Sequence, residues 1–239
     1  MPEIARITAF THRGRVRAHN EDTFVVGQFV SEPSMPAPHA FEEVLSAPLL
    51  CAVADGMGGH RAGEVASRLV AERLAERGAQ ITSADAAVAA LRAVNAELYR
   101  AMAADPRQMG MGTTVVGLVL APRLVWFNVG DSRLYRCGEA LLQISIDDTP
   151  PGPRSGLLTQ CLGGGAPSRA GIVPHAGEIA VETPARFLLC SDGLTDMLDD
   201  DEIAACLAAP DAEAVPELFA RAMRAGGHDN ITIVLVSLG

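Results

Sequence analysis

The chain of 239 residues has no lysine, and all 19 of its basic residues are arginine. A P-loop NTPase, a protein kinase and a Schiff-base enzyme each need a lysine amine, so these classes are excluded. Aromatic residues make up only 4%, so the core must be built from Leu, Val, Ile and Ala. With 49% hydrophobic and 20% charged residues, the composition is that of a globular protein with one sizeable core.

Positive charge is scarce overall, because 29 acidic residues give a formal net charge of −10. Such a surface repels phosphate backbones, so we expect no nucleic-acid partner. No apolar run approaches the roughly 20 residues that cross a bilayer, and residues 1–4 lack signal-peptide character, so we expect no membrane partner. The five scattered cysteines form no C-x-x-C pair. This pattern disfavours disulfides and zinc thiolates and favours a cytoplasmic location.

The hydrophobic pattern predicts an α+β fold. Helical spacing of apolar residues indicates helices at 63–77, 83–103, 200–208 and 212–225, with Ser83 as an N-cap. Strands are predicted at 4–10, 23–29, 49–54, 113–120, 124–129, 133–137, 140–146, 178–182, 186–190 and 231–238. Helices therefore come in pairs and do not alternate with strands, which favours antiparallel sheets covered by helical pairs.

Aspartates stand at the ends of five predicted strands, at positions 22, 55, 131, 192 and 229. A single such acid usually caps a turn, but turn chemistry would not choose Asp over Asn, Ser and Gly every time. If these strand ends converge on one rim, the carboxylates repel one another unless cations lie between them. Hard oxygen ligands suit Mg²⁺ or Mn²⁺, and the lack of clustered His and Cys disfavours zinc.

Four groups of residues resemble the motifs of one family, in that family's order. They are Arg17-Ala18-His19-Asn20-Glu21-Asp22, Val53-Ala54-Asp55-Gly56-Met57-Gly58-Gly59-His60, Gly112-Thr113-Thr114 with Val129-Gly130-Asp131-Ser132-Arg133, and Ser191-Asp192-Gly193-Leu194 with Gly227-His228-Asp229-Asn230. Together they resemble the type 2C (PPM) metal-dependent Ser/Thr protein phosphatases of bacteria. The resemblance implies a four-layer α-β-β-α sandwich with the site at one end of two sheets.

The resemblance also implies roles for individual residues. Asp55 would bridge two Mn²⁺ or Mg²⁺ ions, with the Gly56 carbonyl as a further ligand. Asp192 and Asp229 would hold one ion, and Glu21 and Asp22 would act at the other, partly through water. Asp131 matches the acid of a third, weaker metal site. Arg17 would hold the substrate phosphate through its bidentate guanidinium, and His60 would be the general acid.

Several of these residues have ordinary structural alternatives. Arg17 stands four residues before Glu21, so a local ion pair is possible. His60 could cap the following helix, and Asp131 could be a turn acid beside Arg133. The remaining residues near the motifs are expected to have no metal or nucleophilic role: His19, His175, His228 and Cys190.

Residues 1–239 are expected to form one catalytic domain with two departures from the family pattern. Residues 31–48 are expected to be a surface loop or insertion. Many bacterial members carry a long flap where this chain has only the proline-rich segment 147–156. The reduced flap would leave the metal rim open.

The expected function is metal-dependent hydrolysis of phosphoserine and phosphothreonine in proteins, opposing a bacterial Ser/Thr kinase. One alternative is a phosphatase of small phosphoesters, which an open rim would favour. A second alternative, a catalytically inactive module that binds phosphoproteins, is disfavoured because every expected metal acid is present.

Overall fold

The computed structural model describes residues 4–57, 62–152, 157–165, 171–180 and 182–239. Within them, two antiparallel sheets lie face to face. Neighbouring strands in the first sheet follow the order β10 (Leu141–Gln143), β9 (Arg133–Cys137), β13 (Ala185–Cys190), β14 (Ile231–Leu238), β1 (Ile4–His12) and β4 (His39–Val44).

The second sheet follows the order β11 (Leu162–Gly163), β6 (Gly112–Thr113), β5 (Leu49–Met57), β7 (Val115–Leu120), β8 (Leu124–Val129) and β12 (His175–Ile179). On one side of this path, β2 (Asp22–Val26) pairs with β5, and β3 (Phe29–Val30) pairs with β2.

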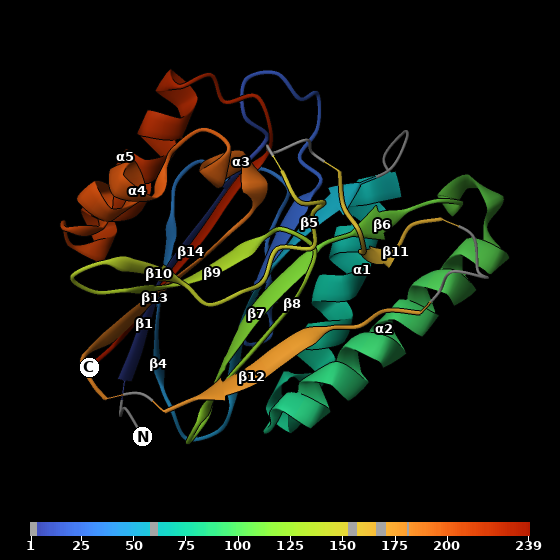
Figure 1. The fold of residues 1–239 in the computed structure, drawn as a ribbon, viewed down its shortest axis with the longest axis horizontal. Coiled ribbons are helices and arrows are strands. Elements are labelled where there is room, and N and C mark those ends of the chain that lie inside the picture. Colours follow the sequence, from blue (N-terminus) through green and yellow to red (C-terminus); the bar gives the residue numbers. More distant parts are fainter. Residues whose placement is uncertain (1–3, 58–61, 153–156, 166–170, 181) are drawn as a thin grey trace.

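Helices cover the outer face of each sheet, which gives the expected four layers (Figure 1). The second sheet is covered by α1 (Ala62–Arg77) and α2 (Ala84–Ala104), and the first by α3 (Asp192–Thr195), α4 (Asp200–Leu207) and α5 (Asp211–Arg224). The predicted cap of α2 is confirmed, because the Ser83 hydroxyl accepts a hydrogen bond from the Ala86 N–H at 3.2 Å. Short 3₁₀ segments follow α1 and α2 at Gly78–Gln80 and Pro106–Gln108.

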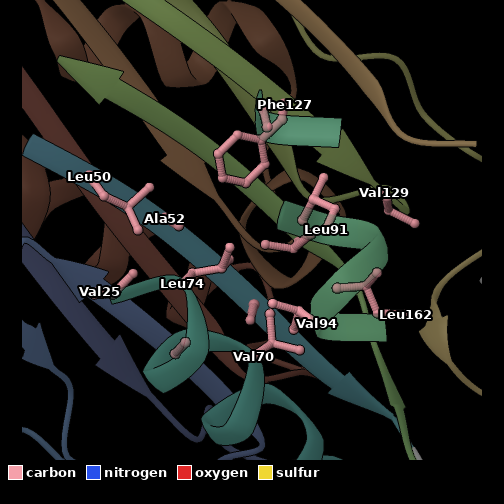
Figure 2. Close-up of a cluster of buried hydrophobic side chains, with 14 of the residues drawn as sticks. Val25, Leu50, Ala52, Val70, Leu74, Leu91, Val94, Phe127, Val129 and Leu162 are labelled. Atoms are coloured by element: carbon pink, nitrogen blue, oxygen red, sulfur yellow. The ribbon is translucent and has the colours of Figure 1, made fainter. Parts of the chain in front are cut away.

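Three buried clusters hold the layers together, and aliphatic residues dominate them. Figure 2 shows the cluster between α1, α2 and the second sheet, where Val70 and Leu74 of α1 meet Leu91 and Val94 of α2. A second cluster fills the space between the two sheets, and a third lies between the first sheet and the C-terminal helices. Each fully buried Val or Leu side chain contributes about 1.5–3 kcal/mol to folding. These clusters therefore fix the strands whose ends carry the acidic residues.

Residues 31–48, expected to be a surface loop or insertion, are not all loop, because they contain the edge strand β4. β4 pairs with β1, with Phe41 opposite Ile7. The Phe41 ring meets the Phe29 ring at a centroid distance of 5.2 Å and stacks on His39 at 4.5 Å. The segment therefore connects the edges of the two sheets, since Phe29 belongs to β3.

Several predicted boundaries also need correction. The strand predicted at 140–146 is only Leu141–Gln143, because the Ser145 hydroxyl and Ile146 N–H bond to Leu134 and Asn128 outside a regular ladder. The strand predicted at 178–182 is His175–Ile179, since its register is fixed by pairing with β8. The described part of the reduced flap, 147–152, has no helix or strand. No helix in the described ranges has the length and apolarity of a membrane span.

Candidate active site

The strand-end acids meet at one end of the sandwich. Asp22 opens β2 and faces Asp55 of β5 in the ladder. The Gly56 N–H donates to the Glu21 carbonyl at 3.1 Å, and the Glu21 N–H donates to Asn230 Oδ1 at 2.8 Å. In Figure 1 the end of β5, the loop after β1 and the segment before β14 gather at the top, away from the two chain ends.

Asp22 lies at the base of this cluster and is only 2% exposed. Its Oδ2 accepts hydrogen bonds from Ser191 Oγ at 2.7 Å and Thr232 Oγ1 at 2.6 Å. Its Oδ1 is buried and accepts no hydrogen bond from a donor among the described residues. Burial raises the pKa of Asp22 to about 6, partly offset by the two hydroxyl donors. A buried carboxylate oxygen without a hydrogen-bond donor is energetically costly unless it binds a cation or a proton.

Asp55 lies close to both Asp22 and Asp192, and the like charges repel one another. Burial raises the pKa of Asp55 well above its ordinary value, and the charges of Asp22, Asp192 and Asp229 add to the shift. Burial also raises the pKa of Asp192 to about 7, with Asp131 as the next largest cause. Asp192 Oδ1 is a second buried oxygen for which the described part of the chain offers no hydrogen-bond donor. Like charges held this close are costly unless cations compensate them.

Asp131 extends the acidic cluster beyond Asp192. Burial raises its pKa to about 6, and the nearby charges of Asp147 and Asp196 raise it further. Arg133 does not pair with Asp131, because its Nη2 binds Asp147 Oδ2 at 2.6 Å. Arg133 is still near enough for its charge to lower the pKa of Asp131. Asp196 is a neighbouring acid that the sequence did not single out.

Arg17 and Glu21 lie next to Asp229 in the cluster. Arg17 Nη2 binds Asp229 Oδ2 at 2.6 Å, so its ion pair is with this distant acid and not with Glu21. The Arg17 side chain is 54% exposed, which leaves part of the guanidinium open to solvent. Burial raises the pKa of Glu21, opposed by the charge of Arg17. Arg17 thus stands where a phosphate could meet both the guanidinium and the acidic rim.

Two glycines allow the backbone segments of the site to pack closely. A Cβ on Gly56 would lie 2.2 Å from the Gly63 carbonyl oxygen and 2.6 Å from that of Glu21. A Cβ on Gly193 would lie 1.9 Å from the Asn230 carbonyl oxygen. Any side chain at these positions would push apart the elements that carry Glu21, Asp55 and Asp192.

Supporting polar residues were not identified from the sequence, because their partners are distant in the chain. Asn230 Nδ2 donates to the carbonyls of Arg13 at 3.0 Å and His19 at 2.9 Å. Thr113 Oγ1 donates to the Asp55 carbonyl at 2.8 Å. These residues fix the backbone of the acidic loops, and their only sequence signal was their place inside the motifs.

The acidic cluster has the ligand chemistry of a divalent-cation site. Among the described residues, no three metal-binding side chains stand in the arrangement of a completed ion site. The chemistry nevertheless fits: the donors are all oxygen, two carboxylate oxygens are orphaned, and the carboxyl pKa values are raised by mutual repulsion. Such a set suits Mg²⁺ or Mn²⁺. Asp55, Asp192 and Asp229, with Asp22, Glu21 and Asp131 around them, are the residues that would hold these ions.

The remaining residues considered in the sequence analysis are not part of the acidic cluster as described. His60, Gly58 and Gly59 lie outside the described residues. His175 Nε2 lies 2.8 Å from Asp148 Oδ1, at the start of the reduced flap. Cys190 is fully buried in β13, and burial raises the pKa of its thiol to about 12, which removes it as a nucleophile.

Comparison with known proteins identifies the family. The family model described as protein phosphatase 2C matches residues 39–232. The chain is 35% identical over 261 residues to the serine/threonine protein phosphatase PstP of Mycobacterium tuberculosis, and covers 45% of that protein. It is 32% identical over 255 residues to the serine/threonine phosphatase stp of Listeria monocytogenes, covering 93% of it. The chain therefore belongs to the protein phosphatase 2C family.

Solved structures agree with this assignment. The crystal structure of the M. tuberculosis phosphatase PstP/Ppp has a TM-score of 0.76 and 33% identity, over 98% of this chain and 99% of that one. The PstP catalytic domain in complex with two manganese ions has a TM-score of 0.77 at 33% identity, with 98% of each chain covered. Stp1 of Staphylococcus aureus has a TM-score of 0.81 at 26% identity, over 100% of this chain and 96% of that one.

Proposed function

We propose that this chain hydrolyses phosphoserine and phosphothreonine in proteins with the help of Mn²⁺ or Mg²⁺. The observation that carries the proposal is the convergence of Asp22, Asp55, Asp192 and Asp229, two of which have buried oxygens without partners. The relatives' names support the substrate class, and the two manganese ions in PstP support the metal.

The ligand roles follow the geometry of the cluster. Asp55 has Asp22, Asp192 and Asp229 as charged neighbours, which supports the role that the resemblance implies for it as a ligand shared by two ions. Asp192 and Asp229 would hold one ion, and Glu21 and Asp22 would serve the other, with the Gly56 carbonyl as a further ligand. Asp131, next to Asp192, is proposed to serve a third ion. His60 keeps its proposed role as general acid on the resemblance alone.

The chain's own residues would orient the substrate and the ligands. Bound cations supply positive charge that neutralises a phosphate dianion and activates a water molecule for attack on phosphorus. Arg17 would hold two phosphate oxygens, because its guanidinium is a planar fork and is half exposed. Ser191 and Thr232 fix Asp22 through its Oδ2, so only its Oδ1 is available to a cation or water.

We further propose that residues 1–239 form one catalytic domain, which the shared cluster between the two sheets supports. We propose that it opposes a Ser/Thr kinase, since a protein phosphatase needs a kinase to supply its substrate. A cytoplasmic location is proposed because all five cysteines are free thiols.

A direct test is phosphate release from a phosphothreonine peptide with Mn²⁺, with and without a chelator. We expect release that depends on the metal, and its loss in Asp192→Asn but not in Asp201→Asn, a matched change at an exposed position of α4. Comparison of kcat/KM for the peptide and for a small phosphoester distinguishes a protein substrate from a small one. Equal release with and without metal would contradict the proposal.

A further inference from the structure

The loop between β1 and β2 carries three arginines at alternate positions, Arg13, Arg15 and Arg17, and all three are exposed. Arg17 binds Asp229. The side chains of Arg13 and Arg15 have no hydrogen bond or ion pair with any residue that the structure describes. Two unpaired cations thus stand beside the arginine proposed to bind phosphate.

This loop is unusual for a chain with a net charge of −10. Arginines elsewhere are commonly neutralised: Arg73 and Arg77 both bind Glu97, and Arg186 binds Asp211. An exposed arginine can also be a simple solubilising group, as we take Arg92 on α2 and Arg136 on β9 to be. Arg13 and Arg15 differ from these because of their position beside the acidic site.

The loop backbone is fixed in that position. Gly14 has φ +74°, and a Cβ there would lie 2.1 Å from the Asp229 carbonyl oxygen, so the loop packs directly on the segment before β14. The Arg15 N–H donates to the Gly227 carbonyl at 2.8 Å, and the Arg13 carbonyl accepts from Asn230. Arg13 and Arg15 are therefore held within a few residues of Asp229 by contacts on both sides.

The part of the acidic cluster beyond Asp192, near Asp131, carries mainly negative charge. Asp131 has Asp147 and Asp196 as negatively charged neighbours, and the arginine near it, Arg133, is paired with Asp147. The charge along the site therefore changes from arginines on the β1–β2 loop to carboxylates near Asp131. A peptide lying across this site would meet cations at one side of its phosphorylated residue and anions at the other.

We propose that Arg13 and Arg15 select peptide substrates with anionic groups next to the phosphorylated residue. This inference rests on the proposed function and specifies its substrate class. The groups would be Asp or Glu carboxylates or a second phosphate, which share the chemistry that an arginine fork binds. An extended peptide advances about 3.3 Å per residue, and four loop residues span at most about 14 Å. Positions within about three residues of the phosphothreonine are therefore in reach.

The test compares three phosphothreonine peptides that differ only in flanking residues: glutamates, glutamines, or one additional phosphoserine. The ratio of kcat/KM for each anionic peptide to that for the glutamine peptide is measured with Mn²⁺ for the wild type and for Arg13→Gln/Arg15→Gln. The matched control is Arg92→Gln/Arg136→Gln, which removes the same charge from exposed, unpaired positions outside the loop. Ratios within one variant cancel any general loss of activity.

We expect wild type and control to prefer an anionic peptide by about fivefold, since each exposed ion pair is weak, and the loop variant to lose this preference. The larger of the two anionic ratios identifies carboxylate or phosphate as the favoured neighbour. If all three peptides release phosphate but the wild type does not prefer the anionic ones, the inference is wrong. It is also wrong if Arg13→Gln/Arg15→Gln keeps the same preference as the wild type. Absence of metal-dependent release from all three peptides would instead overturn the proposed function.

Discussion

At the scale of single residues, the acidic side chains of the site repel one another when they are ionised and then destabilise the fold. Asp22 has one buried oxygen without a partner, and Asp55 is surrounded by Asp22, Asp192 and Asp229. Burying like charges together costs free energy, and such strain is retained at sites where function requires it. The hydroxyls of Ser191 and Thr232 compensate only one oxygen of one member of the cluster.

Replacing Asp55 with Asn should therefore separate activity from stability. We expect Asp55→Asn to lower kcat by about a hundredfold or more, because it removes the central ligand. In chelator at pH 7.5, we expect the same variant to melt about 2–4 °C higher, as if stabilised by about 1 kcal/mol. Phosphate release and thermal melting measure the two effects. Asp201→Asn is the control, and a variant that keeps its turnover or melts below wild type would disprove this account.

At the scale of elements, the position of the loop from β1 to β2 depends on Asn230, which lies more than 200 residues further along the chain. Asn230 is 5% exposed, accepts from the Glu21 N–H and donates to the carbonyls of Arg13 and His19. It thus fixes the loop that carries Arg17 to the segment that carries Asp229. Because its buried amide accepts one of these hydrogen bonds and donates two, Asn230 is a residue that positions the loop carrying Arg17.

Asn230→Ala should mainly impair substrate binding. We expect KM for a phosphopeptide to rise about tenfold with a smaller change in kcat, because Arg17 loses its fixed position, and the free energy of unfolding to fall by about 1–3 kcal/mol. Steady-state kinetics and urea unfolding measure these changes. Gln28→Ala also removes a side chain–backbone bond, to the Ala75 carbonyl, but at the β2–β3 turn, so it should leave KM unchanged. An equal effect of both variants on KM would contradict a positioning role.

The sequence predicted most elements because their signals are local. β8, β9 and β14 have the predicted bounds, since β8 and β14 are mostly apolar runs and β9 lies between bends at Gly130 and Gly138. β4 was missed because His39–Val44 mixes charged and apolar residues, and its strand form depends on β1, more than thirty residues away. The convergence of the aspartates could be predicted from strand ends. Asn230, Ser191 and Thr232 could not be assigned, because their partners lie far along the chain.

At the scale of the whole molecule, the cluster should make stability depend on pH. The pKa of Asp22 and of Asp131 is raised to about 6, and that of Asp192 to about 7, from an ordinary value of 3.8. A raised pKa means that the folded protein binds protons more tightly than the unfolded chain. Stability from these groups is thus present at low pH and is lost as pH rises toward 7.

In chelator, we therefore expect this contribution to the free energy of unfolding to fall between pH 5 and pH 7. His12 has a lowered pKa and contributes an opposite slope, so the comparison is with Asp192→Asn, which shares His12. Urea unfolding across this range should show a smaller loss in the variant than in wild type. Identical slopes would mean that the cluster does not bind these protons. Added Mn²⁺ should reduce the loss in wild type, because cations compensate the ionised carboxylates.

The most direct measurement is the anomalous diffraction of manganese in a crystal of this chain grown with Mn²⁺. The account predicts at least two ions among Asp55, Asp192 and Asp229, with carboxylate oxygens about 2.0–2.3 Å away. It also predicts that Asp22 Oδ1 faces one ion directly or through a water molecule. A map with no manganese among these side chains, under conditions where the protein releases phosphate, would contradict it.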